Sequence, residues 1–216
     1  MSPEKGPLFY ITFVRHGESV GNVENRMQGL SDFPLSETGR AQARSLAQRW
    51  QREGLHFDTA ITSPLSRASE TAHILAADLS IPTIEFEPLW VERDMGTRSG
   101  MTFAEIQTQF PSPEFVNPYD SRHESGESEW ALYLRAGQAL HRVLQRPAGR
   151  YLVVAHGAIL NMALYAILGI TPQPNFQGPR FELGNTAFAA FCYYPDAHRW
   201  RVDVIGDCSH LSSSFA

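Results

Sequence analysis

Short β-type runs alternate with longer helical patterns along almost the whole chain, and this alternation limits the possible folds more than any other feature. Two of the runs, Phe9–Val14 and Tyr151–Ala155, consist almost entirely of apolar residues. Such continuous apolar runs are typical of strands buried on both faces, as the strands of a parallel sheet are. The sequence therefore predicts an α/β fold, a three-layer α/β/α sandwich with a mostly parallel central sheet.

Capping signals and apolar periodicity place the other elements. Ser36 is expected to cap a helix, Pro64 to occupy the first helical position after Ser63, and Thr102 to open a capping box. The expected helices are Glu37 to about Arg52, Pro64 to about Leu79, a short helix after Thr102, Glu127 to about Gln145, and Gly157–Leu168. Further strands are expected at Thr59–Thr62, Asn185–Tyr193 and Trp200–Ile205, with a loop at Pro111–Pro118.

The chain has 216 residues, which suits one domain over residues 1–216 better than two. Within it, residues 93–127 are expected to form a cap-like insertion over the site. The formal net charge of −5 and the lack of a basic run argue against binding to nucleic acid. No apolar stretch is long enough to span a bilayer, and the first apolar run lacks the features of a signal peptide. We therefore expect a cytoplasmic protein that does not bind membranes.

Polar residues follow both apolar runs directly. Arg15 and His16 come after the first run, and His156 and Gly157 come after the second. Because ligands bind at the carboxyl ends of parallel strands, all four are expected to face one crevice. A neutral imidazole is a good nucleophile toward phosphorus, and an arginine binds phosphate oxygens in a bidentate way. On its own, however, an Arg-His-Gly tripeptide is more often a structural feature than a catalytic one.

Longer motifs surround these residues, and they run through almost the whole chain. They are Thr12–Ser19, Arg26–Gly29, Pro34–Gly39, Thr62–Ala72, Glu92–Gly96, Gly126–Ser128, Val153–Gly157 and Gly206–Leu211. In this order they resemble the histidine phosphatase superfamily, also called the phosphoglycerate mutase-like family. The last motif is similar to the ending of the broad-specificity phosphatases of that family.

The resemblance implies a role for each matching residue. His16 corresponds to the phosphorylated histidine, Arg15 and Arg67 to the arginines that hold the phosphoryl group, His156 to a donor to its oxygens, and Glu92 to the general acid. Phosphoryl transfer needs mainly positioning, charge stabilisation and a proton for the leaving group, and these residue types supply all three. The expected contacts to phosphate or substrate are Asn22, Gln28, Gly29, Gly157 and Arg93. No metal and no cofactor is expected.

Each of these residues also has an ordinary structural interpretation. Arg67 could form a surface ion pair with Glu70, His156 could be a core histidine, and Asn22 could make an Asx-turn. Glu92 could be a surface carboxylate, since Glu85 and Glu87 lie close by in the sequence. A dinucleotide-binding site is disfavoured because no G-x-G-x-x-G follows the first strand, and a metal hydrolase because H-E-x-x-H spacing is missing.

The function expected from this pattern is hydrolysis of a small phosphomonoester through a phosphohistidine on His16. The alternative is phosphoryl transfer of the phosphoglycerate mutase type, and a more distant one is non-catalytic binding of a phosphorylated ligand or a protein partner. The segment Asp94–Ser99 departs from the more basic mutase signature, which favours the phosphatase. Phosphorylated sugars, phosphoglycerate derivatives and phosphoserine all remain open as substrates, and the oligomeric state, including a homodimer, stays open. The loop residues Phe115, Tyr119, Arg122 and His123 are candidates to cover the crevice.

Overall fold

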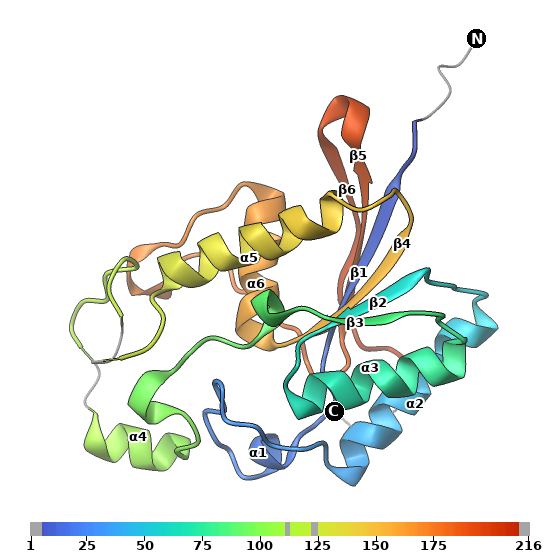
Figure 1. The fold of residues 1–216 in the computed structure, drawn as a ribbon. Helices are drawn as coiled ribbons and strands as arrows, with labels where there is room; N and C mark the ends of the chain where they lie inside the picture. The colour runs from blue at the N-terminus through green and yellow to red at the C-terminus, as the bar shows by residue number, and fades with distance from the viewer. Residues whose placement is uncertain (1–5, 111–112, 122–124, 212–216) are drawn as a thin grey trace.

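Six strands form the middle layer of the protein, whose computed structural model describes residues 6–110, 113–121 and 125–211. The order across the sheet is β3-β2-β4-β1-β5-β6 (Figure 1). The strands are β1 (Phe9–Arg15), β2 (Thr59–Thr62), β3 (Ile84–Phe86), β4 (Arg150–Ala155), β5 (Phe188–Tyr194) and β6 (Arg199–Asp207). The pairs β3–β2, β2–β4 and β4–β1 are parallel, whereas β5 pairs antiparallel with both β1 and β6. The expected mostly parallel α/β sandwich is confirmed.

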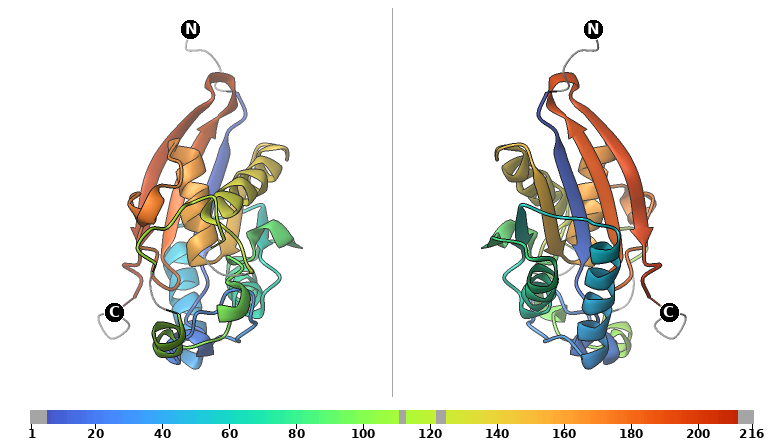
Figure 2. Two further views of the ribbon diagram at one scale, coloured as in Figure 1. Left: turned by 90° about the vertical axis from the view of Figure 1, so that its left-hand side faces the viewer. Right: turned by 90° about the vertical axis from the view of Figure 1, so that its right-hand side faces the viewer.

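Helices cover both faces of this sheet (Figures 1 and 2). They are α1 (Val20–Val23), α2 (Glu37–Arg52), α3 (Ser66–Leu79), α4 (Phe103–Gln109), α5 (Glu129–Leu144) and α6 (Gly157–Leu168), with 3₁₀ turns at Pro88–Trp90, Gly96–Arg98, Pro174–Phe176 and Pro195–Ala197. Side chains of β4 alternate between the faces, as a strand requires. Leu152 and Val154 pack against α2 and α3, and Val153 and Ala155 pack against α5 and α6. This double burial explains the continuous apolar run.

The start of α3 differs from the expectation. The helix begins at Ser66 with Leu65 as its N-cap, so Pro64 precedes it. Ser63 instead directly follows β2, and its backbone N–H donates to the carbonyl oxygen of Val154 at 3.1 Å. Likewise α5 begins at Glu129 rather than at residue 127, since the hydroxyl of Ser128 accepts from the N–H of Ala131 and caps the helix. The short elements α1 and β3 were not predicted, because four and three residues give too little periodicity to recognise.

The carboxyl ends of the parallel strands meet at one edge of the sheet. Arg15, the last residue of β1, is in register with Ala155, the last residue of β4, and Thr62 of β2 pairs with Val154. The residues that follow these strands therefore lie side by side. The antiparallel strand β5 begins at the same edge, since Phe188 is opposite Val14.

Because β5 starts at this edge, residues 169–187 must run back along α6 after that helix ends. Contacts mark the path. The hydroxyl of Tyr165 donates to the carbonyl of Pro179, and one turn earlier in α6 Asn161 bonds the backbone of Phe181. Figure 1 shows this connection in orange.

The expected cap-like insertion at 93–127 includes α4. Backbone hydrogen bonds join the insertion to the loop after α1: the N–H of Met27 donates to the carbonyl of Met101, that of Gly100 to the carbonyl of Met27, and that of Phe103 to the carbonyl of Asn25. Whether this segment acts as a cap stays a prediction. No helix among the described residues has both the length and the apolar character needed to cross a membrane.

Candidate active site

A pocket of about 930 Å³ opens at the edge where the parallel strands end. Nine of the ten residues expected from the sequence line it: Arg15, His16, Asn22, Gln28, Gly29, Arg67, Glu92, Arg93 and Gly157. The tenth, His156, is fully buried behind the pocket wall. The structure thus brings together residues from β1, α3, α6 and the loops between them.

His16 is held so that one ring nitrogen is left available. Its Nδ1 lies 2.7 Å from the carbonyl oxygen of Gly17, which can only accept a hydrogen bond. Nδ1 therefore carries the proton and Nε2 keeps its lone pair. Burial lowers the pKa of His16 well below its usual value, and the positive charges of Arg15 and Arg67 lower it further. The imidazole is neutral, which is the form required of a nucleophile.

The backbone around His16 is fixed by close packing. The N–H of Gly17 donates to the hydroxyl of Thr71 in α3 at 3.0 Å. A Cβ atom at Gly17 would come within 2.5 Å of the carbonyl oxygen of Gly39 in α2, so no larger residue fits. Asn185 donates its side-chain amide to the carbonyl of His16 at 3.0 Å. Three segments that are distant in sequence therefore hold His16 in place.

Arg15 and Arg67 have guanidinium groups fixed by backbone carbonyls. Arg15 Nη1 donates to the carbonyl of Leu183 at 2.8 Å, and its Nε is buried without a hydrogen-bond partner among the described residues. Arg67 Nη1 and Nη2 donate to Ser31 and Gly29, each at 2.9 Å. Burial lowers the pKa of both arginines, while the charge of Glu92 raises it. An unpaired buried guanidinium N–H suits a phosphate oxygen.

The surface ion pair considered for Arg67 does not form. Its possible partner Glu70 instead binds Arg40, with 2.5 Å between Nε and Oε1. Arg67 itself is 1% exposed. Arg67 forms no ion pair with any described residue, and it lines the pocket.

His156 supports Arg67 from behind. Its Nδ1 accepts from Arg67 Nε at 3.2 Å, so Nε2 carries the proton and faces the hydroxyl of Ser63 at 2.8 Å. The rings of His156 and His16 lie 5.1 Å apart. Burial lowers the pKa of His156 well below its usual value, and Arg67 adds to the effect. Both ring nitrogens are engaged by the protein, which matches the core-histidine alternative; a direct contact with a phosphoryl group would require one of these hydrogen bonds to open.

Glu92 lies at the first turn of α6. Its Oε1 accepts from the N–H groups of Arg93 at 2.8 Å and Ile159 at 3.3 Å, and its Oε2 accepts from Ala158 at 3.2 Å. The positive end of the helix dipole favours an ionised carboxylate there. The other nearby glutamates are committed elsewhere, Glu85 to Arg146 and Glu87 to Arg142.

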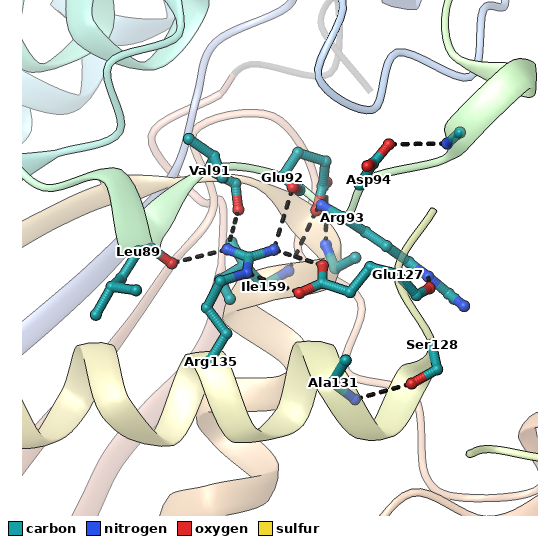
Figure 3. A network of polar contacts seen from close by, with 12 residues as sticks. Leu89, Val91, Glu92, Arg93, Asp94, Glu127, Ser128, Ala131, Arg135 and Ile159 are labelled. Carbon is teal, nitrogen blue, oxygen red and sulfur yellow. Dashed lines mark hydrogen bonds and ion pairs between the residues drawn. The ribbon is translucent and has the colours of Figure 1, made fainter. Parts of the chain in front are cut away.

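A network beneath Glu92 holds its backbone (Figure 3). Arg135 of α5 forms a bidentate pair with Glu127, with distances of 2.8 and 2.7 Å. The same guanidinium donates to the carbonyl oxygens of Leu89 and Val91, both at 2.8 Å, and to that of Glu92 at 3.2 Å. The loop segment that carries Glu92 is thereby fixed to α5.

The remaining expected contacts have structural partners of their own. Asn22 closes a capping box with Ser19 at the start of α1, and Gln28 accepts from the hydroxyl of Ser19 at 2.8 Å. Arg93 donates to the carbonyl of Glu127 at 3.0 Å and lies 3.9 Å from Glu129. Asn22 thus makes the local turn considered for it, although it also lines the pocket.

Sequence reasoning did not identify one wall of the pocket. Residues 113–121, expected to help cover the crevice, do not line it, and Phe115 and Tyr119 are 61% and 62% exposed. Arg122 and His123 lie outside the described residues. The wall comes instead from residues 173–184, together with Asn161 of α6. The unusual length of the segment between Leu168 and Asn185 was a signal that could have pointed to it.

Among the described residues, no cluster of three or more histidine, cysteine, aspartate or glutamate side chains could hold a metal ion. Cys192 and Cys208 are both free thiols.

Known proteins are similar to this chain over most of its length. The model of the family described as histidine phosphatase superfamily (branch 1) matches residues 11–207. A probable phosphoglycerate mutase, GpmB of Cronobacter sakazakii, is 35% identical over 95% of this chain and 96% of that protein. An uncharacterized phosphatase, PhoE of Bacillus subtilis, is 32% identical over 94% of this chain and 96% of that protein.

Among solved structures, YhfR of Bacillus stearothermophilus is similar, with a TM-score of 0.83 and 29% identity over 94% of this chain and 100% of that one. Relatives of this chain thus carry names of phosphatases and of phosphoglycerate mutases. The chain belongs to the histidine phosphatase superfamily, branch 1.

Proposed function

We propose that the protein is a phosphatase that hydrolyses a small phosphomonoester through a phosphohistidine at Nε2 of His16. One observation carries the proposal: a neutral imidazole whose Nδ1 is hydrogen-bonded to Gly17 stands in a pocket beside two arginines that form no ion pair with any described residue. Such a site offers a nucleophile and a fixed positive field to a tetrahedral dianion.

The first step transfers the phosphoryl group to the enzyme. The lone pair of His16 Nε2 attacks phosphorus while the bond to the ester oxygen breaks. Arg15 and Arg67 stabilise the charge on the equatorial oxygens. Glu92 gives its proton to the departing alkoxide, which is otherwise a poor leaving group.

The second step returns the enzyme to its starting state. Water attacks the phosphohistidine, Glu92 takes one proton from it, and the bond between phosphorus and Nε2 breaks. Inorganic phosphate leaves, and His16 is again neutral. No other reactant is needed.

A mutase is the second candidate, because a relative at 35% identity is named a probable phosphoglycerate mutase. Both activities share the first step and differ in whether water or a substrate hydroxyl takes the phosphoryl group. The segment after Glu92 favours the phosphatase, since it has few cations aimed at the pocket. Arg98 does not line the pocket, and its guanidinium stacks 4.2 Å from the centroid of the Phe110 ring.

The deciding experiment measures phosphate release and phosphoryl migration side by side. The wild type is expected to release phosphate from p-nitrophenyl phosphate and from small alkyl phosphates, with no interconversion of 2- and 3-phosphoglycerate. His16→Ala should abolish turnover, and a chelator should not affect the wild type. Activity that survives in the variant, or that disappears with the chelator, contradicts the mechanism; isomerisation faster than release makes the protein a mutase.

The proposed partner is a small phosphorylated metabolite, and the proposed location is the cytoplasm. Two unpaired cysteines, one of them the exposed Cys208, fit a reducing compartment.

A further inference from the structure

The pocket wall formed by residues 173–184 is anchored to α6 at two points. The side chain of Asn161 bonds the backbone of Phe181 twice: Oδ1 accepts from its N–H at 2.9 Å, and Nδ2 donates to its carbonyl at 3.0 Å. The hydroxyl of Tyr165 donates to the carbonyl of Pro179 at 2.8 Å. The residue between these two anchors is Arg180.

The same segment is also tied to the catalytic centre. Three residues beyond Arg180, the carbonyl oxygen of Leu183 accepts from Nη1 of Arg15 at 2.8 Å. This hydrogen bond therefore fixes the position of the wall relative to Arg15, the proposed phosphate-binding arginine. The charge of Arg180 is close enough to Arg15 to lower its pKa.

Arg180 differs from the other arginines of the pocket in what its side chain does. Arg67 is fixed by carbonyl oxygens, Arg26 pairs with Glu24, and Arg93 is engaged by Glu127 and Glu129. Arg180 lines the pocket, is exposed, and makes no hydrogen bond or ion pair with any described residue. Its backbone is fixed while its guanidinium is uncommitted.

We propose that Arg180 binds a second anionic group of the substrate, so that the preferred substrates are phosphomonoesters whose leaving group carries a carboxylate or another phosphate. This inference rests on the proposed phosphatase function and names its substrate class. A guanidinium binds either anion through two parallel hydrogen bonds. The anchors at Pro179 and Phe181 reduce the ordering that binding would otherwise require.

The size and lining of the pocket agree with a ligand longer than a phosphate alone. A volume of about 930 Å³ leaves space between the His16 centre and the wall. The exposed carboxylate of Glu182 also lines the pocket, and it disfavours an anion that is not held by Arg180 itself. The geometry thus assigns anion recognition to one side chain.

The test compares matched pairs of substrates in wild type and Arg180→Gln. One pair, 3-phosphoglycerate and glycerol 3-phosphate, differs by the carboxylate; the other, fructose 1,6-bisphosphate and fructose 6-phosphate, differs by the second phosphate. In the wild type kcat/KM should be higher, in at least one pair, for the member that carries the second anionic group. Arg180→Gln should lower kcat/KM for that member roughly tenfold, mostly through KM, as expected for one charge-assisted hydrogen-bonded contact, and leave the other member within about twofold.

Two further variants complete the design. Arg180→Lys keeps the charge and should retain part of the preference. Arg52→Gln removes an exposed arginine at the end of α2, outside the pocket, and should change neither substrate of a pair. Equal loss on both members of each pair in Arg180→Gln, or no loss on either, overturns the assignment. Failure of the proposed function is a different result, since p-nitrophenyl phosphate would then not be hydrolysed by the wild type at all.

Discussion

Replacing Arg135 by methionine tests whether the network beneath Glu92 stabilises both the fold and the site. The side chains of Arg135 and Glu127 are 17% and 14% exposed, so the pair is largely removed from water. Methionine keeps most of the bulk but leaves the Glu127 carboxylate and three carbonyl oxygens, those of Leu89, Val91 and Glu92, without their donor.

The magnitude follows from these contacts. Removing one partner of a buried ion pair costs about 3–5 kcal/mol. Because a small part of each side chain reaches water, we expect a loss near the lower end, about 3 kcal/mol in the free energy of unfolding. For a chain of 216 residues, 1 kcal/mol corresponds to roughly 2–4 °C in Tm, so Tm should fall by about 6–12 °C.

Differential scanning calorimetry and steady-state kinetics on the same preparations provide the readouts. Arg142→Met is the matched control: its arginine also pairs with a glutamate, Glu87, but is 57% exposed, so the loss should stay below about 1 kcal/mol. Below the melting range, Arg135→Met should lower kcat for an alkyl phosphate more than for an aryl phosphate, because Glu92 loses its fixed backbone. A Tm shift no larger than that of the control refutes the reasoning. If Arg135→Met does not fold, Arg135→Lys provides the same comparison.

Four further predictions concern the proton donor, pH and backbone packing. Glu92→Gln should slow alkyl phosphates far more than aryl phosphates, whose leaving groups need less protonation; equal slowing in a paired assay argues against the acid role. Because the pKa of His16 lies well below its usual value, its protonation should not reduce kcat/KM between pH 7.5 and about pH 6, and a fall with a midpoint near 6.5 that tracks the His16 imidazole by NMR would contradict this. Burial also lowers the pKa of His210 to about 4, so on acidification the unfolded chain binds this proton before the folded one does. The stability that this group contributes is present above about pH 6.5 and is lost as the pH falls toward 4. The His210→Gln variant should therefore lose less stability than the wild type on acidification, as urea titrations can measure. Gly39→Ala should destabilise by more than about 2 kcal/mol, because its Cβ would overlap the backbone of residue 18, whereas Gly137→Ala in α5 has open space and should stabilise by up to about 1 kcal/mol; similar Tm values for the two variants would be inconsistent with the packing.

Much of the fold was predictable because its strongest signals are local. The apolar runs of β1 and β4 reflect burial on both faces, and the caps at Ser36 and Thr102 act within one turn of helix. The start of α3 was predicted wrongly because the backbone pairing at the end of β2, with the Ser63 N–H bonded to Val154, overrides the Ser-Pro signal. Such pairing joins residues far apart in sequence, so no local pattern reports it.

In the candidate site, too, some residues could be predicted from the sequence and others could not. Arg15, His16 and Gly157 could be placed at one edge because each ends, directly follows or opens an element whose direction the α/β pattern fixes. The surroundings of His156 could not be read, since its hydrogen bonds depend on side chains from two other segments. Arg180 reaches the pocket because β5 runs antiparallel to β1, so the segment before β5 returns to this edge of the sheet. The direction of β5 could not be predicted, since an apolar run has the same pattern in a parallel and in an antiparallel strand.

The antiparallel direction of β5 also decides how freely the chain between α6 and β5 can vary in length. The helix has 12 residues and is about 18 Å long, a distance that about six extended residues can cover. The segment 169–187 is far longer than this, so most of it is surplus to the span. Insertions and deletions in its middle part can reshape the substrate end of the pocket without shifting the register of β5 against β1. The proposed nucleophile thus directly follows a strand whose register is fixed, whereas the proposed substrate contact Arg180 lies on a segment whose length can vary.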